Sequence, residues 1–277
     1  AAGGGFVPNL PNNKIAWNGG RLIGPQNGYP EADWPTRERI SRQYLDAMLM
    51  RLWYVQNDPA APGADRVKFQ DYGLAVDEFQ DNGNVPYEIY VREARRLVGR
   101  SVFTEHDNKV APGFSRTSVH ADSVAITDWP VDSVACLKRS VPGGNLDGIF
   151  FLGEETRPAQ VPYQCLLPQG VDNLLVPVAL SASHVGWGAI RLEPVWMQTG
   201  ESAGFAAALA VKNKTTPAQL NPDLLVRMLA TRRVMVSFFN DVDVTSGEPW
   251  IPAVQYFGTK GFFHSYDAKP GALLSEP

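Results

Sequence analysis

The feature that most constrains this chain is a long helix whose second half consists mostly of glycine and alanine. It is predicted from Pro194 to about Lys212, because a proline fits the first position of a helix, where its missing N–H has no partner anyway. Gly200 and Gly204 lie four residues apart, so one side of the helix is flat. Glycine inside a helix costs about 0.5–1 kcal/mol relative to alanine. Two of them indicate either tight helix–strand packing or the close approach of a flat ligand or another backbone.

A short apolar run and a loop of small residues precede this helix. The run at residues 173–178 is predicted to be a strand. The loop after it contains Ser183 and Gly188 and two strongly polar side chains, His184 and Arg191. Small residues let backbone approach a ligand, and a helix N-terminus supplies unpaired N–H groups and a positive dipole. Strand, loop and helix in this order are typical of an anion or cofactor site in an α/β protein.

Arg191 has two interpretations at this stage. A cation ahead of a helix N-terminus adds to the positive potential there, which suits a phosphate or an electron-rich ring that gains negative charge. Alternatively, Arg191 is a structural residue that binds loop carbonyls. The sequence leaves both interpretations open.

Weaker patterns surround the central segment. Residues 1–35 are rich in Gly, Pro and Asn and are expected to be extended and loop-dominated. Residues 235–277 are aromatic without a clear period, and Thr36 and Asn221 are expected to cap helices. The four arginines of residues 92–100 are expected to form a solvated face. Periodicity predicts helices at 36–56, 86–99 and 221–234 and strands at 101–104, 123–126 and 148–152.

The composition excludes some partners. The formal net charge is −4, so there is no electrostatic reason to expect nucleic acid or an anionic membrane. No apolar run has the length of a membrane span, and no signal peptide pattern is present. Because the chain begins with Ala1, we expect that an upstream segment was removed.

Three further features were considered for chemistry. Cys136 and Cys165 could form one disulfide. Asn213 begins a glycosylation sequon, which fits a secreted glycoprotein, although the compartment stays open. His106 and His120 have acidic neighbours but no spacing of a zinc site, so no metal is expected.

Several motifs, in conserved order along the chain, resemble a family of FAD-dependent oxidoreductases whose members are often labelled xanthan lyase-like. In the central segment these are PYQCLLP (162–168), GVDNLLV (170–176), SASH (181–184), GAIR (188–191), Pro194 and GESAG (200–204). Elsewhere they are YPEADW (29–34), DEF (77–79), YVREARR (90–96), TKGFF (259–263) and YDA (266–268).

The resemblance implies an α/β fold in which a Rossmann-like FAD-binding domain is interrupted by a substrate-binding or cap domain. Residues 1–150 would form the middle, substrate-cap region, and residues 151–216 the returning strand and helix of the FAD domain. Residues 217–277 would form a C-terminal helix and a loop-rich aromatic tail.

The resemblance also implies the site. The N-terminus of the helix from Pro194 would face the pyrimidine edge of the flavin, where reduction builds negative charge. His184 and Arg191 would be the catalytic side chains, with His184 a candidate for proton transfer to substrate. The residues expected to contact the cofactor are Ser183, Gly188, Arg191, Pro194, Gly200, Glu201, Ala203 and Gly204.

One difference from the family limits these expectations. The G-x-G-x-x-G turn that would hold the ADP half of FAD is missing from the sequence. We therefore expect the chain to be the C-terminal half of such a protein, which binds FAD only when an N-terminal half or companion chain completes it.

The substrate is expected to be a small molecule. A carbohydrate is one candidate, because Trp250, Tyr256 and Phe262 would suit a flat-faced ligand, although aromatic side chains more often simply pack. Two other functions stay open. One is a lyase-type enzyme acting on a polysaccharide, with His120, Tyr163 and Arg191 as candidate groups. The other is a flavin-free binding or structural protein.

Overall fold

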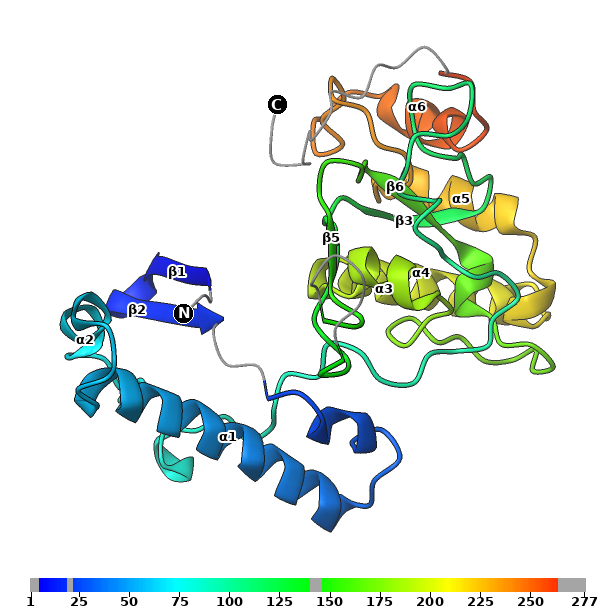
Figure 1. Ribbon diagram of the computed structural model, residues 1–277. Coiled ribbons are helices and arrows are strands. Elements are labelled where there is room, and N and C mark those ends of the chain that lie inside the picture. Colours follow the sequence, from blue (N-terminus) through cyan, green and yellow to red (C-terminus); the bar gives the residue numbers. More distant parts are fainter. Residues whose placement is uncertain (1–4, 19–21, 140–145, 264–277) are drawn as a thin grey trace. The chain divides into compact units, whose positions relative to one another are not determined.

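The computed structural model describes residues 5–18, 22–139 and 146–263 of the chain. The YDA motif at 266–268 lies outside the described residues. The chain forms two compact units (Figure 1). The first comprises Ala1–Val91 and Ala135–Asp147, and the second comprises Arg92–Val134 and Gly148–Pro277. Each unit is therefore assembled from two separate stretches of the chain.

The first unit begins with a hairpin. Strands β1 (Gly5–Leu10) and β2 (Lys14–Asn18) pair antiparallel across the 3₁₀ turn η1 (Pro11–Asn13). Asn12 has a φ of 62°, a left-handed conformation that asparagine tolerates better than most residues. The prediction of a loop-dominated start is therefore wrong over the hairpin, because cross-strand hydrogen bonds order a segment that shows no period of its own.

Helix α1 (Trp34–Asn57) confirms the helix predicted over 36–56. Its cap is Asp33, whose carboxylate accepts the N–H of Thr36 at 3.0 Å, so the prediction that Thr36 caps the helix is wrong. Helix α2 (Gly63–Phe69) packs against α1. Two short 3₁₀ helices also belong to this unit, η2 (Pro25–Gly28) and η3 (Gln80–Asn82).

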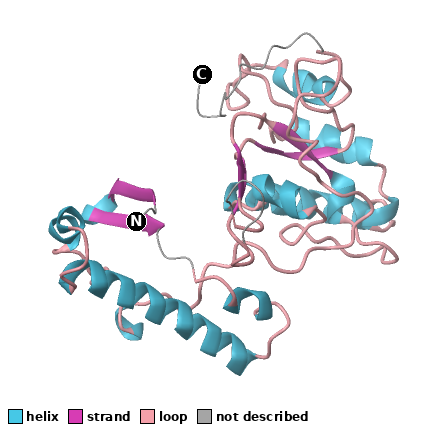
Figure 2. Ribbon diagram, in the orientation of Figure 1, coloured by secondary structure: helices cyan, strands magenta, loops and turns pink. Residues whose placement is uncertain are grey.

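The second unit contains two antiparallel strand pairs (Figure 2). Strand β3 (Ser123–Thr127) pairs with β6 (Ala159–Pro162), and β4 (Val131–Ser133) pairs with β5 (Phe150–Leu152). Every residue of β3 and β6 is buried. The strand predicted at 123–126 is confirmed by β3, and the one at 148–152 is confirmed in part by β5.

Helices surround these strands. The predictions at 194–212 and 221–234 are confirmed by α4 and α5, although α5 ends three residues earlier than expected. Asn221 caps α5 as predicted, because its side chain accepts the N–H of Asp223 at 3.0 Å. Helix α6 was not predicted. The helical elements are η4 (Tyr163–Leu166), α3 (His184–Ile190), α4 (Glu193–Lys212), η5 (Pro217–Gln219), α5 (Pro222–Thr231) and α6 (Ile251–Gly258).

Helix α4 packs against β3 (Figure 1). Polar contacts also fix it there. The Ser202 hydroxyl donates to the Val124 carbonyl at 2.6 Å, and the Ile126 N–H donates to Gln198 Oε1 at 2.7 Å. Helix α5 packs against α4 and α6. The largest fully buried apolar side chains of the unit are Tyr163, Phe103, Leu166, Leu180, Ile190, Leu225, Leu229 and Ile251.

Residues 86–99 do not form the predicted helix. The Leu97 N–H donates to the Ala179 carbonyl at 2.8 Å, and the Val98 carbonyl accepts the Gln169 N–H at 3.0 Å. The backbone groups of this segment are thus bound by residues far along the chain. Such non-local pairing overrides the helical spacing of its apolar side chains.

Two predicted strands are also wrong. Residues 173–178 are irregular, since Pro177 lacks an N–H and two of the apolar side chains are about half exposed. Residues 101–104 contribute only one parallel bridge, between Phe103 and Ala182.

The chain is mixed helix and strand, as the sequence predicts. Its described strands pair antiparallel, in three two-stranded pairs. The assignment of residues 1–150 to a cap and of 151–216 to an FAD domain stays a prediction. The two compact units show which segments pack together, but they do not show what either unit binds.

Cys136 and Cys165 are both free thiols, so they do not form a disulfide with each other. Burial raises the pKa of Cys165 to about 12. Asn213 is exposed at the end of α4, and its glycosylation stays a prediction. Within the described ranges, no helix combines the length and apolar character needed to cross a membrane.

Candidate functional site

The predicted site residues lie at the two ends of α3 and along α4. Ser183 caps α3, because its hydroxyl oxygen accepts the N–H of Gly186 at 2.9 Å. His184 is therefore the first residue of a helix. The expectation that it lies in an open loop is wrong, since a serine cap starts a helix before the small residues that follow.

Glu93 and Arg96 hold the His184 ring. His184 Nδ1 lies 3.0 and 2.8 Å from the two carboxylate oxygens of Glu93. Arg96 pairs with the same carboxylate, and its Nε donates to the Ala182 carbonyl at 2.9 Å. The Phe150 ring meets the imidazole edge to face, with centroids 5.5 Å apart. The orientation of the imidazole is thus set by both polar and aromatic contacts.

The His184 side chain is 35% exposed, so solvent or a ligand can reach it. Burial, and after it the Arg96 guanidinium, lowers the pKa of His184, while a hydrogen bond to the Gly148 carbonyl acts in the opposite direction. The ordinary pKa of histidine is about 6.5, and the lowering of the pKa of His184 favours the neutral ring. A neutral imidazole has one N–H, and it has two acceptors nearby, the Glu93 carboxylate and the Gly148 carbonyl.

Arg191 lies at the opposite end of α3 and is only 6% exposed. Its Nη2 contacts Oδ1 of Asp132 at 2.5 Å, and the same oxygen accepts the Trp129 indole N–H at 3.2 Å. A helix of seven residues is about 10 Å long, so His184 and Arg191 act in separate surroundings. The Asp132 pair favours the structural interpretation of Arg191; a direct role at a cofactor stays a prediction.

The glycines of this region fall into two groups. A Cβ added to Gly188 would lie 2.5 Å from the Asp132 carbonyl oxygen, and one added to Gly186 would lie 2.6 Å from a backbone oxygen. At Gly200 and Gly204 an added Cβ would meet no atom of the described chain within 4 Å. The flat side of α4 is therefore not covered by the part of the chain that the structure describes.

The first turn of α4 follows Leu192, whose side chain makes no capping hydrogen bond. Pro194 is its second residue, in place of the predicted first. Glu193, which sequence reasoning missed, is exposed in the first turn and lowers the positive potential there. Farther along, Glu201 is exposed and Ala203 is 8% exposed.

Sequence reasoning also missed Glu93, Arg96 and Asp132. Glu93 lies 91 residues before His184 and Asp132 lies 59 before Arg191, so no local spacing indicates either pair. The expectation of a solvated arginine face is wrong for Arg96, whose side chain is only 24% exposed. The YVREARR motif of the resemblance was the one signal that pointed to this segment.

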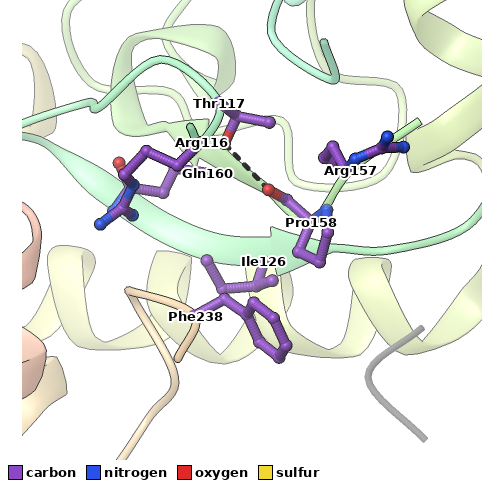
Figure 3. A pocket seen from close by; sticks show the side chains of 7 residues that line it. All are labelled: Arg116, Thr117, Ile126, Arg157, Pro158, Gln160 and Phe238. Carbon is purple, nitrogen blue, oxygen red and sulfur yellow. Dashed lines mark hydrogen bonds between the residues drawn. The ribbon is translucent and has the colours of Figure 1, made fainter. Parts of the chain in front are cut away.

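A cavity elsewhere in the second unit contains none of the predicted site residues (Figure 3). Its volume is about 10 Å³, enough for about one water molecule and too small for a substrate. Thr117 closes one side by donating to the Pro158 carbonyl at 2.9 Å. Its lining residues are Arg116, Thr117, Ile126, Arg157, Pro158, Gln160 and Phe238.

The residues considered for a lyase have separate partners. His120 Nε2 lies 2.9 Å from Asp107 Oδ1. Tyr163 is buried, donates to the Pro217 carbonyl at 2.9 Å, and has a pKa raised by burial to about 12. Among the described residues, no cluster of three or more His, Cys, Asp or Glu could hold a metal ion.

Comparison with known protein families gives one match. Residues 5–229 match the family described as FAD dependent oxidoreductase, a range that includes both α3 and α4. The comparisons found no matching curated protein and no matching solved structure. Because the family match spans well over half of the 277 residues, the chain belongs to the FAD-dependent oxidoreductase family.

Proposed function

We propose that this chain is part of a flavin-dependent oxidoreductase that oxidises a small molecule, with His184 as the group that accepts the substrate proton. The observation that carries the proposal is the pair formed by His184 and Glu93. A neutral imidazole oriented by a carboxylate is a common arrangement for a general base. The pair lies within the family match.

One feature of the chain fits the flavin end of FAD. The side of α4 at Gly200 and Gly204 leaves room for a flat ring or another backbone. The first turn of α4 supports a developing negative charge less well, because Pro194 has no N–H and the Val195 N–H donates to the Leu192 carbonyl at 3.1 Å. Glu193 adds a negative charge there, and Arg191 is engaged by Asp132. We therefore assign ring contacts to α4 and not to Arg191.

The ADP half of FAD requires other residues. The resemblance assigns it to a G-x-G-x-x-G turn, which this sequence does not contain. We propose that an N-terminal half of the protein or a companion chain supplies these contacts, and that this chain supplies contacts to the ring.

Bound FAD would supply the two-electron acceptor. For a substrate with a CH–OH group, it would take up the C–H hydrogen with its electron pair as the C=O bond forms. The hydroxyl proton passes to His184, where Glu93 and the Gly148 carbonyl stabilise the resulting cation. A sugar hydroxyl is one substrate of this kind.

Flavin titrations of the purified chain test the proposal. FAD and FMN share the ring but differ in the ADP portion, so we expect the chain alone to bind both weakly, with Kd values within about tenfold of each other, as 1.4 kcal/mol corresponds to tenfold. Flavin fluorescence provides the measurement. Gly200→Leu should weaken both, whereas Gly247→Leu, at an equally open glycine outside α4, should not.

Two results would contradict parts of the proposal. Binding of FAD more than a hundredfold tighter than FMN would show that the chain holds the ADP half itself. Failure of both flavins to bind, together with no flavin binding after an N-terminal half is supplied, would overturn the function.

A further inference from the structure

The segment that carries Glu93 is fixed on both sides of that residue. The Trp187 indole N–H, from α3, donates to the Arg92 carbonyl at 2.8 Å. Arg96 donates through Nε to the Ala182 carbonyl, next to the cap of α3. Because its backbone is extended and not helical, this segment places the Glu93 carboxylate directly against His184.

The imidazole has two acceptors and, when neutral, one proton. Glu93 faces Nδ1 through both carboxylate oxygens, and the Gly148 carbonyl also accepts from the ring. The nitrogen that carries the proton is set by the stronger acceptor, which is the carboxylate. Free histidine favours the proton on Nε2, so the arrangement selects the less common tautomer.

Arg96 has a distinct part in this arrangement. Its guanidinium binds Oε1 of Glu93, one of the two carboxylate oxygens that contact the ring, and so fixes the position of that carboxylate. The positive charge of Arg96 also lowers the pKa of His184 and so disfavours its protonation. Arg96 thus favours a neutral imidazole beside an ionised carboxylate over an imidazolium.

We propose that Glu93 is a positioning residue that fixes His184 as the Nδ1–H tautomer, so that Nε2 is the proton-accepting nitrogen, and that Arg96 holds Glu93 in place. Its catalytic consequence rests on the proposed function. The tautomer itself is a property of this chain alone and requires neither cofactor nor substrate to measure.

The chain contains a matched control. His120 is bound to Asp107 through Nε2, so the same reasoning assigns His120 the opposite, Nε2–H tautomer. Both pairs lie in the second unit. One sample therefore reports two histidines whose carboxylate partners contact different ring nitrogens.

Proton–nitrogen correlation spectra of the ¹⁵N-histidine-labelled chain at pH 7 test the proposal. His184→Asn and His120→Asn assign the signals. We expect an Nδ1–H signature for His184 and an Nε2–H signature for His120. Glu93→Ala should convert His184 to predominantly Nε2–H and leave His120 unchanged, and Asp107→Ala should alter His120 alone.

Each outcome decides the proposal. An Nε2–H signature for His184 in the unmodified chain, or no change in Glu93→Ala, overturns it. If Glu93→Ala does not fold, Glu93→Gln replaces it: its amide oxygen still accepts from Nδ1, so the tautomer should persist while the measured pKa of His184 falls. The expected tautomers together with no flavin binding, even after an N-terminal half is supplied, would refute the proposed function and not the role of Glu93.

Discussion

Two glycine-to-alanine substitutions, twelve positions apart, should change stability in opposite directions. At Gly188 in α3, an added Cβ would lie 2.5 Å from the carbonyl oxygen and 2.8 Å from the nitrogen of Asp132. At Gly200 in α4 it would meet no described atom within 4 Å. The chemical change is the same, so the difference reports the packing alone.

The magnitudes follow from these distances. Ordinary Cβ contacts begin at 3.4 Å, so β4 would have to move by 3.4 − 2.5 = 0.9 Å at Gly188. Overpacking of this kind costs about 1–3 kcal/mol, and the shift also disturbs the Asp132–Arg191 pair. At Gly200 only the helix preference for alanine applies, a gain of about 0.5–1 kcal/mol.

Urea unfolding followed by circular dichroism measures both effects, with equal m-values required for the comparison. We expect the midpoint to fall for Gly188→Ala and to rise for Gly200→Ala, with Gly204→Ala as a second open position. A neutral or stabilising Gly188→Ala would refute the close approach of β4. A destabilising Gly200→Ala would show that something packs against that side of α4.

Three other perturbations test separate contacts. Asp132→Ala should cost about 3–5 kcal/mol in the free energy of unfolding, because it leaves buried Arg191 without its carboxylate; Asp132→Asn should cost less. Hydrogen bonds from Lys260 and then Tyr256 lower the pKa of Asp223 to about 2. The contribution of ionised Asp223 to the free energy of unfolding is therefore complete above pH 3.8 and is lost as pH falls through 2. With solvent screening it amounts to about 1 kcal/mol, and Asp223→Asn should remove that acid dependence, as seen in urea midpoints at pH 2 and pH 5. Buried Cys165, with a pKa of about 12, should resist a thiol reagent in the native chain and react in urea; native labelling would contradict its burial.

The sequence predicted those elements whose signals are local. Helix α1 has regular apolar spacing, α4 begins near a proline, and α5 has an asparagine cap, and all three are present. Residues 86–99 also have helical spacing, but the Leu97 N–H and the Val98 carbonyl bind residues 82 and 71 positions later. Residues 173–178 are mostly apolar, but the side chains of Leu174 and Val178 are about half exposed. Neither non-local hydrogen bonding nor exposure can be inferred from spacing alone.

The same limit applies to the candidate site. His184 and Arg191 stand out because they are the polar residues of a small-residue segment. Their partners, Glu93 and Asp132, come from segments 91 and 59 residues away, and only the folded chain brings them together. These partners decide the chemistry, because Glu93 orients His184, a partly exposed base, and Asp132 neutralises Arg191, a buried cation.

The small residues around α3 and α4 therefore serve two purposes that the sequence does not separate. At Gly186 and Gly188 the backbone of another segment of the same chain lies where a Cβ would be, so these glycines are explained by packing within the fold. At Gly200 and Gly204 no described part of the chain packs against the glycine, although each glycine lowers the stability of the helix. A glycine that destabilises its helix and packs against no described part of the chain is best explained by contact with another molecule. We therefore expect the cofactor to contact the open side of α4 and not the α3 glycines or Arg191, with His184 as the proposed base.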